Sequence, residues 1–112
     1  MNERMLRVNS IVRHVLAEEI ERLSDERLEF VTVTGVDTAP DLRHAIVYVD
    51  VLGDQEPALE ALDRAGRRLQ AALGAQVSMK YTPRLEFAID PAVVSGNRID
   101  ALLREIGKVE EE

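Results

Sequence analysis

The stretch AIVYVDV, residues 45–51, decides the fold, because every second residue in it is alanine or valine. That two-residue period places the apolar side chains on one face of a β-strand. A second β-branched stretch, FVTVT at residues 30–34, ends at Gly35 and predicts a neighbouring strand. The link at residues 37–42 is short and rich in turn-forming residues, which favours an antiparallel pair.

Helical periodicity flanks this pair of strands. Apolar residues recur at three- and four-residue spacing through residues 3–23, and again through residues 59–73 after Asp54, a plausible N-cap. Gly66 interrupts the second helix, at a cost of about 1 kcal/mol relative to alanine. The helix therefore either tolerates this glycine, bends there, or lets another element approach it closely.

A third strand and a last helix complete the pattern. Residues 85–89 alternate apolar side chains with others, and Asp90 is the expected cap of a helix whose apolar stripe reaches Ile106, although Ser95 or Gly96 could begin it instead. The order helix, strand, strand, helix, bend, helix, strand, helix predicts an α+β fold with a three-stranded sheet covered by helices. Residues 1–108 form one expected domain, and residues 109–112 a short acidic tail.

The composition is typical of a single cytoplasmic domain. A chain of 112 residues that is 46% hydrophobic can bury one core and is too apolar to stay disordered. It contains no cysteine and no apolar run long enough to span a membrane, and its N-terminus lacks a secretory pattern. We therefore expect a cytoplasmic protein whose stability depends on its core alone.

Charge is distributed unevenly along the chain. The formal net charge is -7, which by itself disfavours a nucleic-acid partner. Yet residues 4–17 and 64–85 carry only basic charges, whereas acids concentrate in residues 18–29 and 110–112. A basic face on an acidic protein is compatible with an anionic partner, although ordinary solvated surface is an equally good explanation of such runs.

No convincing catalytic or cofactor site is present. The sequence has no G-x-G-x-x-G, no Walker A motif and no metal-binding H-E-x-x-H, so we expect no catalysis, cofactor or metal. The histidines, His14 and His44, are expected to be solvated. Asp37 and Asp41 could be imagined as metal ligands of a hydrolase, but acids beside a turn more often form Asx turns.

The element order is that of the type II KH architecture, an RNA-binding fold that usually clamps the RNA backbone with a G-x-x-G loop. No two glycines of this chain are three positions apart: they are Gly35, Gly53, Gly66, Gly74, Gly96 and Gly107. The clamp is therefore missing, and the chain is either a divergent KH domain or not one.

Several stretches resemble the ribosome-binding factor A family, and together they span nearly the whole chain. They are Arg7-Val8-Asn9, Asp25-Glu26-Arg27-Leu28, Val31-Thr32-Val33-Thr34-Gly35-Val36, Asp41-Leu42-Arg43-His44-Ala45, Thr82-Pro83-Arg84-Leu85-Glu86-Phe87 and Gly96-Asn97-Arg98-Ile99. That family has a KH-like fold in which an Ala-x-Gly helix kink replaces the clamp loop. Here Ala65 and Gly66 stand at the kink, with the glycine moved by one position.

The resemblance implies a non-catalytic, monomeric factor. Its expected partners are small-subunit rRNA and the immature 30S ribosomal subunit, and an assembly GTPase is a further partner that the resemblance allows. It would assist late maturation of 16S rRNA, including processing of the 5′ end, by binding and stabilising one conformation, a role connected with cold adaptation. The alternative is a protein-interaction or dimerisation module that uses the acidic residues 18–29.

Phosphate contacts are expected from the basic stretches. The first group surrounds the kink and opens two strands, and a second group lies near the N-terminus; the candidates are Arg67, Arg68, Lys80, Arg84 and Arg43, with Arg4 and Arg7. The competing explanation is that these residues serve solubility and helix formation. Aromatic residues are few, so recognition through RNA backbone and shape is expected more than base readout, with Tyr81 as a minor candidate for stacking.

Overall fold

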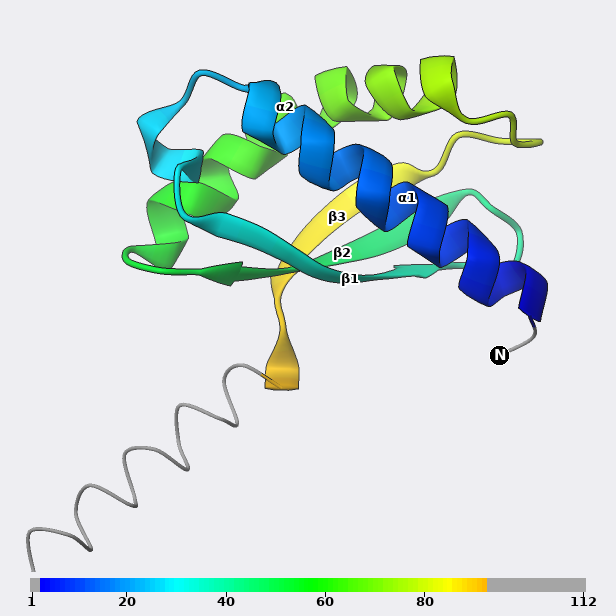
Figure 1. The fold of residues 1–112 in the computed structure, drawn as a ribbon, viewed down its shortest axis with the longest axis horizontal. Coiled ribbons are helices and arrows are strands. Elements are labelled where there is room, and N and C mark those ends of the chain that lie inside the picture. The colour runs from blue at the N-terminus through cyan, green and yellow to red at the C-terminus, as the bar shows by residue number, and fades with distance from the viewer. Residues whose placement is uncertain (1–2, 93–112) are drawn as a thin grey trace, which may run out of the picture.

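Two helices and a three-stranded sheet make up residues 3–92, the part of the chain that the computed structural model describes. The elements are α1 (Glu3–Arg22), a 3-10 turn η1 (Glu26–Leu28), β1 (Val31–Thr38), β2 (His44–Val51), α2 (Gln55–Gln76) and β3 (Arg84–Ile89). This order confirms the α+β prediction and is consistent with a KH-like fold (Figure 1). The last helix, except for its first residues 91 and 92, and the acidic tail lie outside the described residues.

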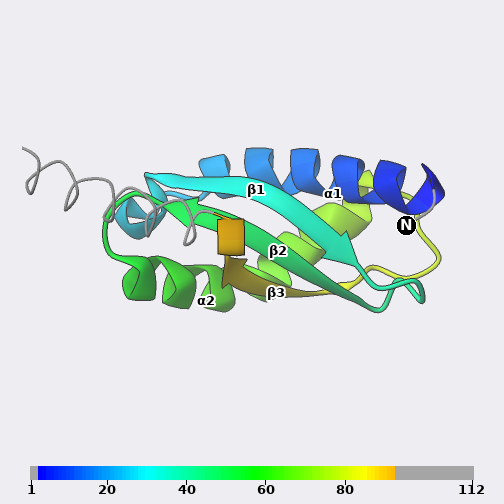
Figure 2. The same cartoon turned by 90° about the horizontal axis from the view of Figure 1, so that it is seen from below.

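The sheet has the order β1-β2-β3. β1 is antiparallel to β2, as predicted, and β3 runs parallel to β2 on its other side. α1 packs on β1 and α2 packs on β3. Figure 2 shows the strands in front of both helices, so α1 and α2 cover the same face of the sheet.

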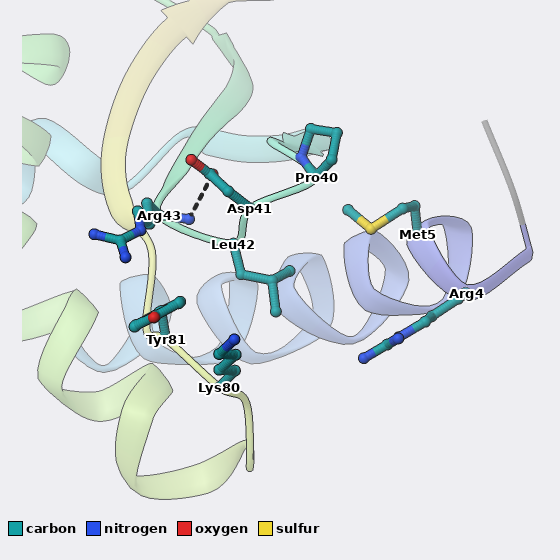
Figure 3. A pocket seen from close by; sticks show the side chains of 8 residues that line it. All are labelled: Arg4, Met5, Pro40, Asp41, Leu42, Arg43, Lys80 and Tyr81. Carbon is teal, nitrogen blue, oxygen red and sulfur yellow. Dashed lines mark hydrogen bonds between the residues drawn. The ribbon is translucent and has the colours of Figure 1, made fainter.

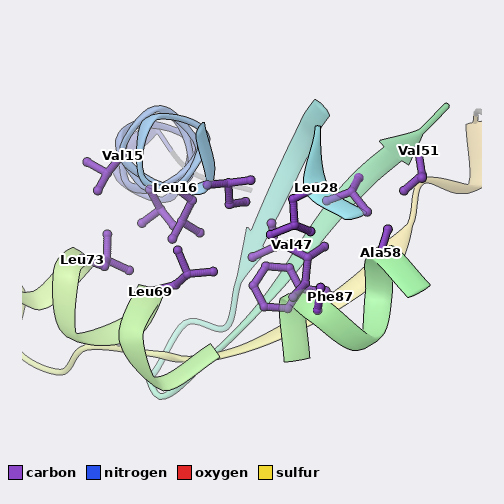
Figure 4. Close-up of a cluster of buried hydrophobic side chains, with 14 residues drawn as sticks. Val15, Leu16, Leu28, Val47, Val51, Ala58, Leu69, Leu73 and Phe87 are labelled. Carbon is purple, nitrogen blue, oxygen red and sulfur yellow. The ribbon is translucent and has the colours of Figure 1, made fainter. Parts of the chain in front are cut away.

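The core lies between that face and the two helices (Figure 4). The alternation in β2 places Ala45, Val47, Val49 and Val51 inward, all buried. Leucines of both helices cover them, and Phe87 of β3 is buried with them. The two-residue period therefore predicted the inward face of the sheet correctly.

β1 does not end at Gly35, as the sequence suggested, but continues to Thr38. A register shift between Val33 and Gly35 forms a β-bulge, which inserts one extra residue and resets the alternation. The Thr34 hydroxyl of this bulge donates a 2.6 Å hydrogen bond to the Asp90 carboxylate beyond β3. This bond, together with one from the Ala92 amide, lowers the pKa of Asp90, and the Ala92 bond fits the predicted helix cap.

α2 is an unbroken helix from Gln55 to Gln76, although Figure 1 shows its two halves running in different directions. Asp54 occupies its N-cap position but makes no side-chain capping bond. A Cβ atom added at Gly66 would meet nothing within 4 Å, so no described element approaches this glycine closely. The close approach occurs at Gly74, where a Cβ would lie 2.8 Å from the Thr82 hydroxyl.

Thr38 ends β1 with a buried polar group that lacks a partner. Its amide donates to the Asn9 side-chain oxygen at 2.9 Å, which ties α1 to the end of β1. Its hydroxyl is buried and has no hydrogen-bond partner among residues 3–92. Replacing Thr38 by valine keeps the shape and removes the unpaired hydroxyl, so we expect about 1 kcal/mol of added stability.

Urea denaturation of Thr38→Val and of the parent protein measures this difference. Thr32→Val, at an exposed position of the same strand, is the matched control, because it adds the same valine without removing a buried hydroxyl. A loss of stability in Thr38→Val alone would show that the hydroxyl has a bonding partner.

Candidate nucleic-acid interface

A hollow of about 460 Å³ lies where the start of α1, the β1–β2 turn and the segment before β3 come together. Arg4, Arg43 and Lys80, one basic residue from each, line it (Figure 3). Tyr81 and the apolar parts of Met5, Pro40 and Leu42 form the rest of the lining, and Asp41 is its acidic member. The three cations are far apart in the sequence, and only the fold brings them together.

The β1–β2 turn holds an unusual backbone conformation. Leu42 has a φ of 64°, in the left-handed region that non-glycine residues rarely adopt. The Leu42 amide donates to the Ala39 carbonyl at 2.8 Å, and the Asp41 carboxylate accepts from the Arg43 amide at 3.0 Å. The second bond is the Asx turn predicted for Asp41. The turn is thus fixed by hydrogen bonds, and its Leu42 side chain lines the hollow (Figure 3).

Tyr81 lies between two of the cations. The Arg43 guanidinium carbon is 4.4 Å from the centre of the Tyr81 ring, and the Lys80 ammonium is 5.5 Å from it. Both distances are within the range of cation–π attraction, which holds the basic groups beside an aromatic face. Tyr81 as a whole is 37% exposed, so this aromatic residue is accessible to a ligand from solvent.

Hydrogen bonds fix the segment that carries Lys80 and Tyr81. The Gln70 side chain of α2 donates to the Thr82 carbonyl at 3.1 Å, and Pro83 is fully buried. The Arg84 amide donates to the Arg43 carbonyl at 3.0 Å, which joins the start of β3 to the start of β2. These bonds hold the backbone next to Lys80 against α2 and the backbone of Arg43 against β3.

The positive charge of the hollow is not neutralised by ion pairs. Within residues 3–92, acids pair with other basic residues, namely Arg22 with Glu19, Arg27 with Asp25 and Arg64 with Glu60. No ion pair in that part of the chain involves any predicted phosphate contact. All of these predicted contacts are exposed to solvent. The hollow therefore offers cations that an anionic ligand can reach.

The structure divides the predicted contacts into separate places. Arg4 joins Arg43 and Lys80 in the hollow, although the sequence placed it in a second patch. Arg84 begins β3 beside Arg43, and Arg7 is exposed on α1 but does not line the hollow.

Arg67 and Arg68 lie elsewhere, in the middle of α2. Arg68 lines another hollow of about 310 Å³ together with Arg27 and Arg64, and Arg67 lines neither hollow. Arg67 and Arg68 are thus close to Lys80 in the sequence, but they do not line the hollow that Lys80 lines. The left-handed Leu42 was missed as well, because no glycine or asparagine signalled such a conformation.

The side-chain chemistry of this interface suits binding. Arginine and lysine recognise phosphate oxygens, and an exposed tyrosine ring can lie against a base or sugar. The histidines are exposed and lie near acids: His14 is 3.2 Å from Glu18 and His44 is 3.1 Å from Glu86. In residues 3–92 no three His, Asp or Glu side chains gather as they would to hold a metal ion. No described helix has the length and apolar character needed to cross a membrane.

Comparison with known proteins gives consistent matches. The family Ribosome-binding factor A matches residues 4–103. The ribosome-binding factor A of Rubrobacter xylanophilus is 44% identical over 106 residues, covering 92% of this chain and 87% of that protein.

Solved structures resemble the fold as well. The crystal structure of ribosome-binding factor A from Thermus thermophilus has a TM-score of 0.74 and 42% identity, over 76% of this chain and 94% of that one. A homology model of the Thermus thermophilus factor, fitted into a cryo-EM map of a complex with the 30S subunit, has a TM-score of 0.66 and 44% identity. It covers 74% of this chain and 91% of that one.

Proposed function

Because the chain belongs to the ribosome-binding factor A family, we propose that it associates with free 30S small ribosomal subunits and assists late maturation of 16S rRNA, including 5′-end processing. It acts by binding and by stabilising one rRNA conformation, without catalysis. The observation that supports this proposal is the convergence of Arg4, Arg43 and Lys80 on one hollow, in which Arg43 and Lys80 lie beside Tyr81. The Thermus thermophilus relative fitted into a 30S complex supports the choice of partner.

The hollow binds the sugar-phosphate backbone. Arg4 and Lys80 contact phosphates of the backbone, and the exposed side of Tyr81 lies against a sugar or base. Arg43 contacts phosphate as well. Because such contacts carry little sequence information, specificity comes from the folded shape of the rRNA. Arg84, which begins β3 beside Arg43, and Arg7 of α1 are further contacts outside the hollow, and Arg67 and Arg68 form a separate group of contacts on α2.

Ala65 and Gly66 provide the bend of α2 in this proposal. An added Cβ at Gly66 meets nothing, so Gly66→Ala should gain about 0.5–1 kcal/mol of stability from helix propensity. If the rRNA requires the bent helix, the same substitution weakens binding while the protein becomes more stable. Thermal unfolding and subunit binding, measured on one preparation, separate the two effects. A variant that is more stable and binds as well as the parent would remove the role of Gly66.

Co-sedimentation tests the proposed function. The purified protein should sediment with free small subunits and not with assembled ribosomes, as a monomeric cytoplasmic factor would, and an assembly GTPase is a further partner to add to the mixture. Accumulation of 16S rRNA with an unprocessed 5′ end in cells lacking the protein would support the maturation role. Sedimentation with neither particle would contradict the proposal.

A further inference from the structure

Two large apolar side chains lie exposed at the far end of the β1–β2 pair. Phe30 is 59% exposed and Leu52 is 77% exposed. They are backbone neighbours, since the Leu52 amide donates to the Phe30 carbonyl at 3.2 Å. Together with Val51 and Pro57 they line a hollow of about 250 Å³. Single exposed apolar residues are ordinary, but two adjacent ones on a hydrogen-bonded strand pair form a surface suited to a partner.

Acidic side chains surround this apolar surface. Glu26 and Asp54 line the same hollow, and Glu21 and Glu29 line an adjoining groove of about 560 Å³ that also contains Leu23. Within residues 3–92 none of these four carboxylates forms an ion pair or a side-chain hydrogen bond.

Arg27 is the basic residue that lines the hollow of Phe30 and Leu52, and its charge does not offset these acids. Arg27 holds the carboxylate of Asp25 through two hydrogen bonds of 3.0 and 2.8 Å. Those bonds lower the pKa of Asp25 and raise that of Arg27, so both stay charged and their charges cancel locally. The surface around Phe30 and Leu52 is thus apolar at its centre and negative at its rim.

We propose that this acidic-rimmed surface of Phe30 and Leu52 docks a basic protein segment that presents an apolar side chain. The apolar side chain fits against Phe30 and Leu52, and lysines or arginines on either side meet Glu26, Glu29 and Asp54. RNA is the wrong occupant, because phosphates would face unpaired carboxylates.

The position of the surface allows both partners to bind together. Val31 pairs with Val51 at one end of β1, and Thr38 pairs with Ala45 at the other, next to the basic hollow. The hollow of Arg4, Arg43 and Lys80 and the surface of Phe30 and Leu52 therefore lie at opposite ends of the same strand pair (Figure 1). One molecule can hold rRNA at one end and a basic protein segment at the other.

A titration followed by NMR tests the proposal. The full-length ¹⁵N-labelled protein is titrated with a short synthetic peptide of lysine and leucine, and in parallel with a peptide in which serine replaces every leucine. The lysine–leucine peptide should shift the amides of residues 25–30 and 51–54, and Phe30→Ala/Leu52→Ala should weaken its binding about tenfold or more. Leu52→Lys, at a highly exposed position, should also weaken it by repelling the peptide. Ile11→Ala, at an exposed apolar residue of α1, is the matched control and should bind as the parent does.

Binding of equal strength by the parent and Phe30→Ala/Leu52→Ala would overturn the proposal, as would equal binding of the serine peptide. Amide shifts confined to other parts of the chain would do the same. An rRNA fragment that loses affinity on the double substitution would identify a nucleic acid as the occupant instead. Because rRNA binding is measured separately on the same variants, failure of this inference is distinguishable from failure of the proposed function.

Discussion

Replacing Arg43 and Lys80 together by alanine is expected to weaken binding to free small subunits by at least about a hundredfold. Each cation is worth about 1.5–3 kcal/mol in a charge-assisted hydrogen bond to phosphate, and 1.4 kcal/mol is about tenfold in affinity. The salt dependence should change too, because each lost phosphate contact lowers the slope of log affinity against log salt by about one. The double variant should therefore show a slope smaller by about two.

Binding isotherms between about 50 and 200 mM salt measure both quantities. The matched control is Arg13→Ala/Arg22→Ala, which removes the same two charges from exposed positions of α1 outside the hollow. It should lose far less affinity, because only the long-range field changes. Thermal unfolding should change little in either variant, because the Arg22–Glu19 ion pair and the Arg43–Tyr81 contact that they remove both lie at the protein surface. Equal losses in the two variants would mean that net charge, and not the hollow, governs binding.

Leu16→Ala is expected to cost about 3–4 kcal/mol of unfolding free energy. Leu16 is completely buried between α1 and α2, near Leu69 and Leu73 (Figure 4). Its truncation removes apolar contact and leaves a cavity that a close-packed core fills only in part. Since such a domain is stable by only about 5–15 kcal/mol, the loss is a large fraction of the total.

Thermal and urea unfolding measure this loss, and the midpoint temperature should fall by more than about 10 °C. Leu6→Ala is the control, because it makes the same chemical change on the same helix at a side chain that is 56% exposed. That variant should stay within about 0.5 kcal/mol of the parent. Similar losses in both variants would contradict the packing of α1 described here.

The helices and strands could be predicted because their causes are local. The alternating valines of residues 45–51 produced β2 with its inward face correct, and the spacing of apolar residues produced α1 to within one residue of its end. A period of two or of about 3.6 residues is imposed by backbone geometry alone. No knowledge of the rest of the chain was needed for either.

The bulge of β1 was not predicted, because its cause lies in residues that are far away in the sequence. Gly35 reads as the end of a strand, but β2 supplies partners beyond it, and Thr34 reaches Asp90 across the sheet. Those partners are distant in the sequence. β1 therefore continues past Gly35 because β2 still pairs with it there, against the local sequence signal.

The basic surface was likewise predictable only in part: the sequence indicated which residues are basic, and the structure decided which of them lie together. Charge distribution made Arg43 and Lys80 candidate contacts for an anionic partner, and the family resemblance predicted the KH-like fold. Sequence neighbourhood grouped Lys80 with Arg67 and Arg68, whereas in the structure Lys80 lines one hollow with Arg4 and Arg43, and Lys80 and Arg43 lie beside Tyr81.

The sequence by itself thus determined α1 and α2, two of the three strands nearly to their ends, the apolar faces and the separation of basic from acidic stretches along the chain. Only the tertiary structure decided which cations meet, that Leu42 takes a left-handed conformation, and that Phe30 and Leu52 lie side by side among acids. The physical reason is the distance along the chain over which each effect acts. Periodicity and propensity act over a few residues, while a binding surface is made by the packing of elements that are tens of residues apart.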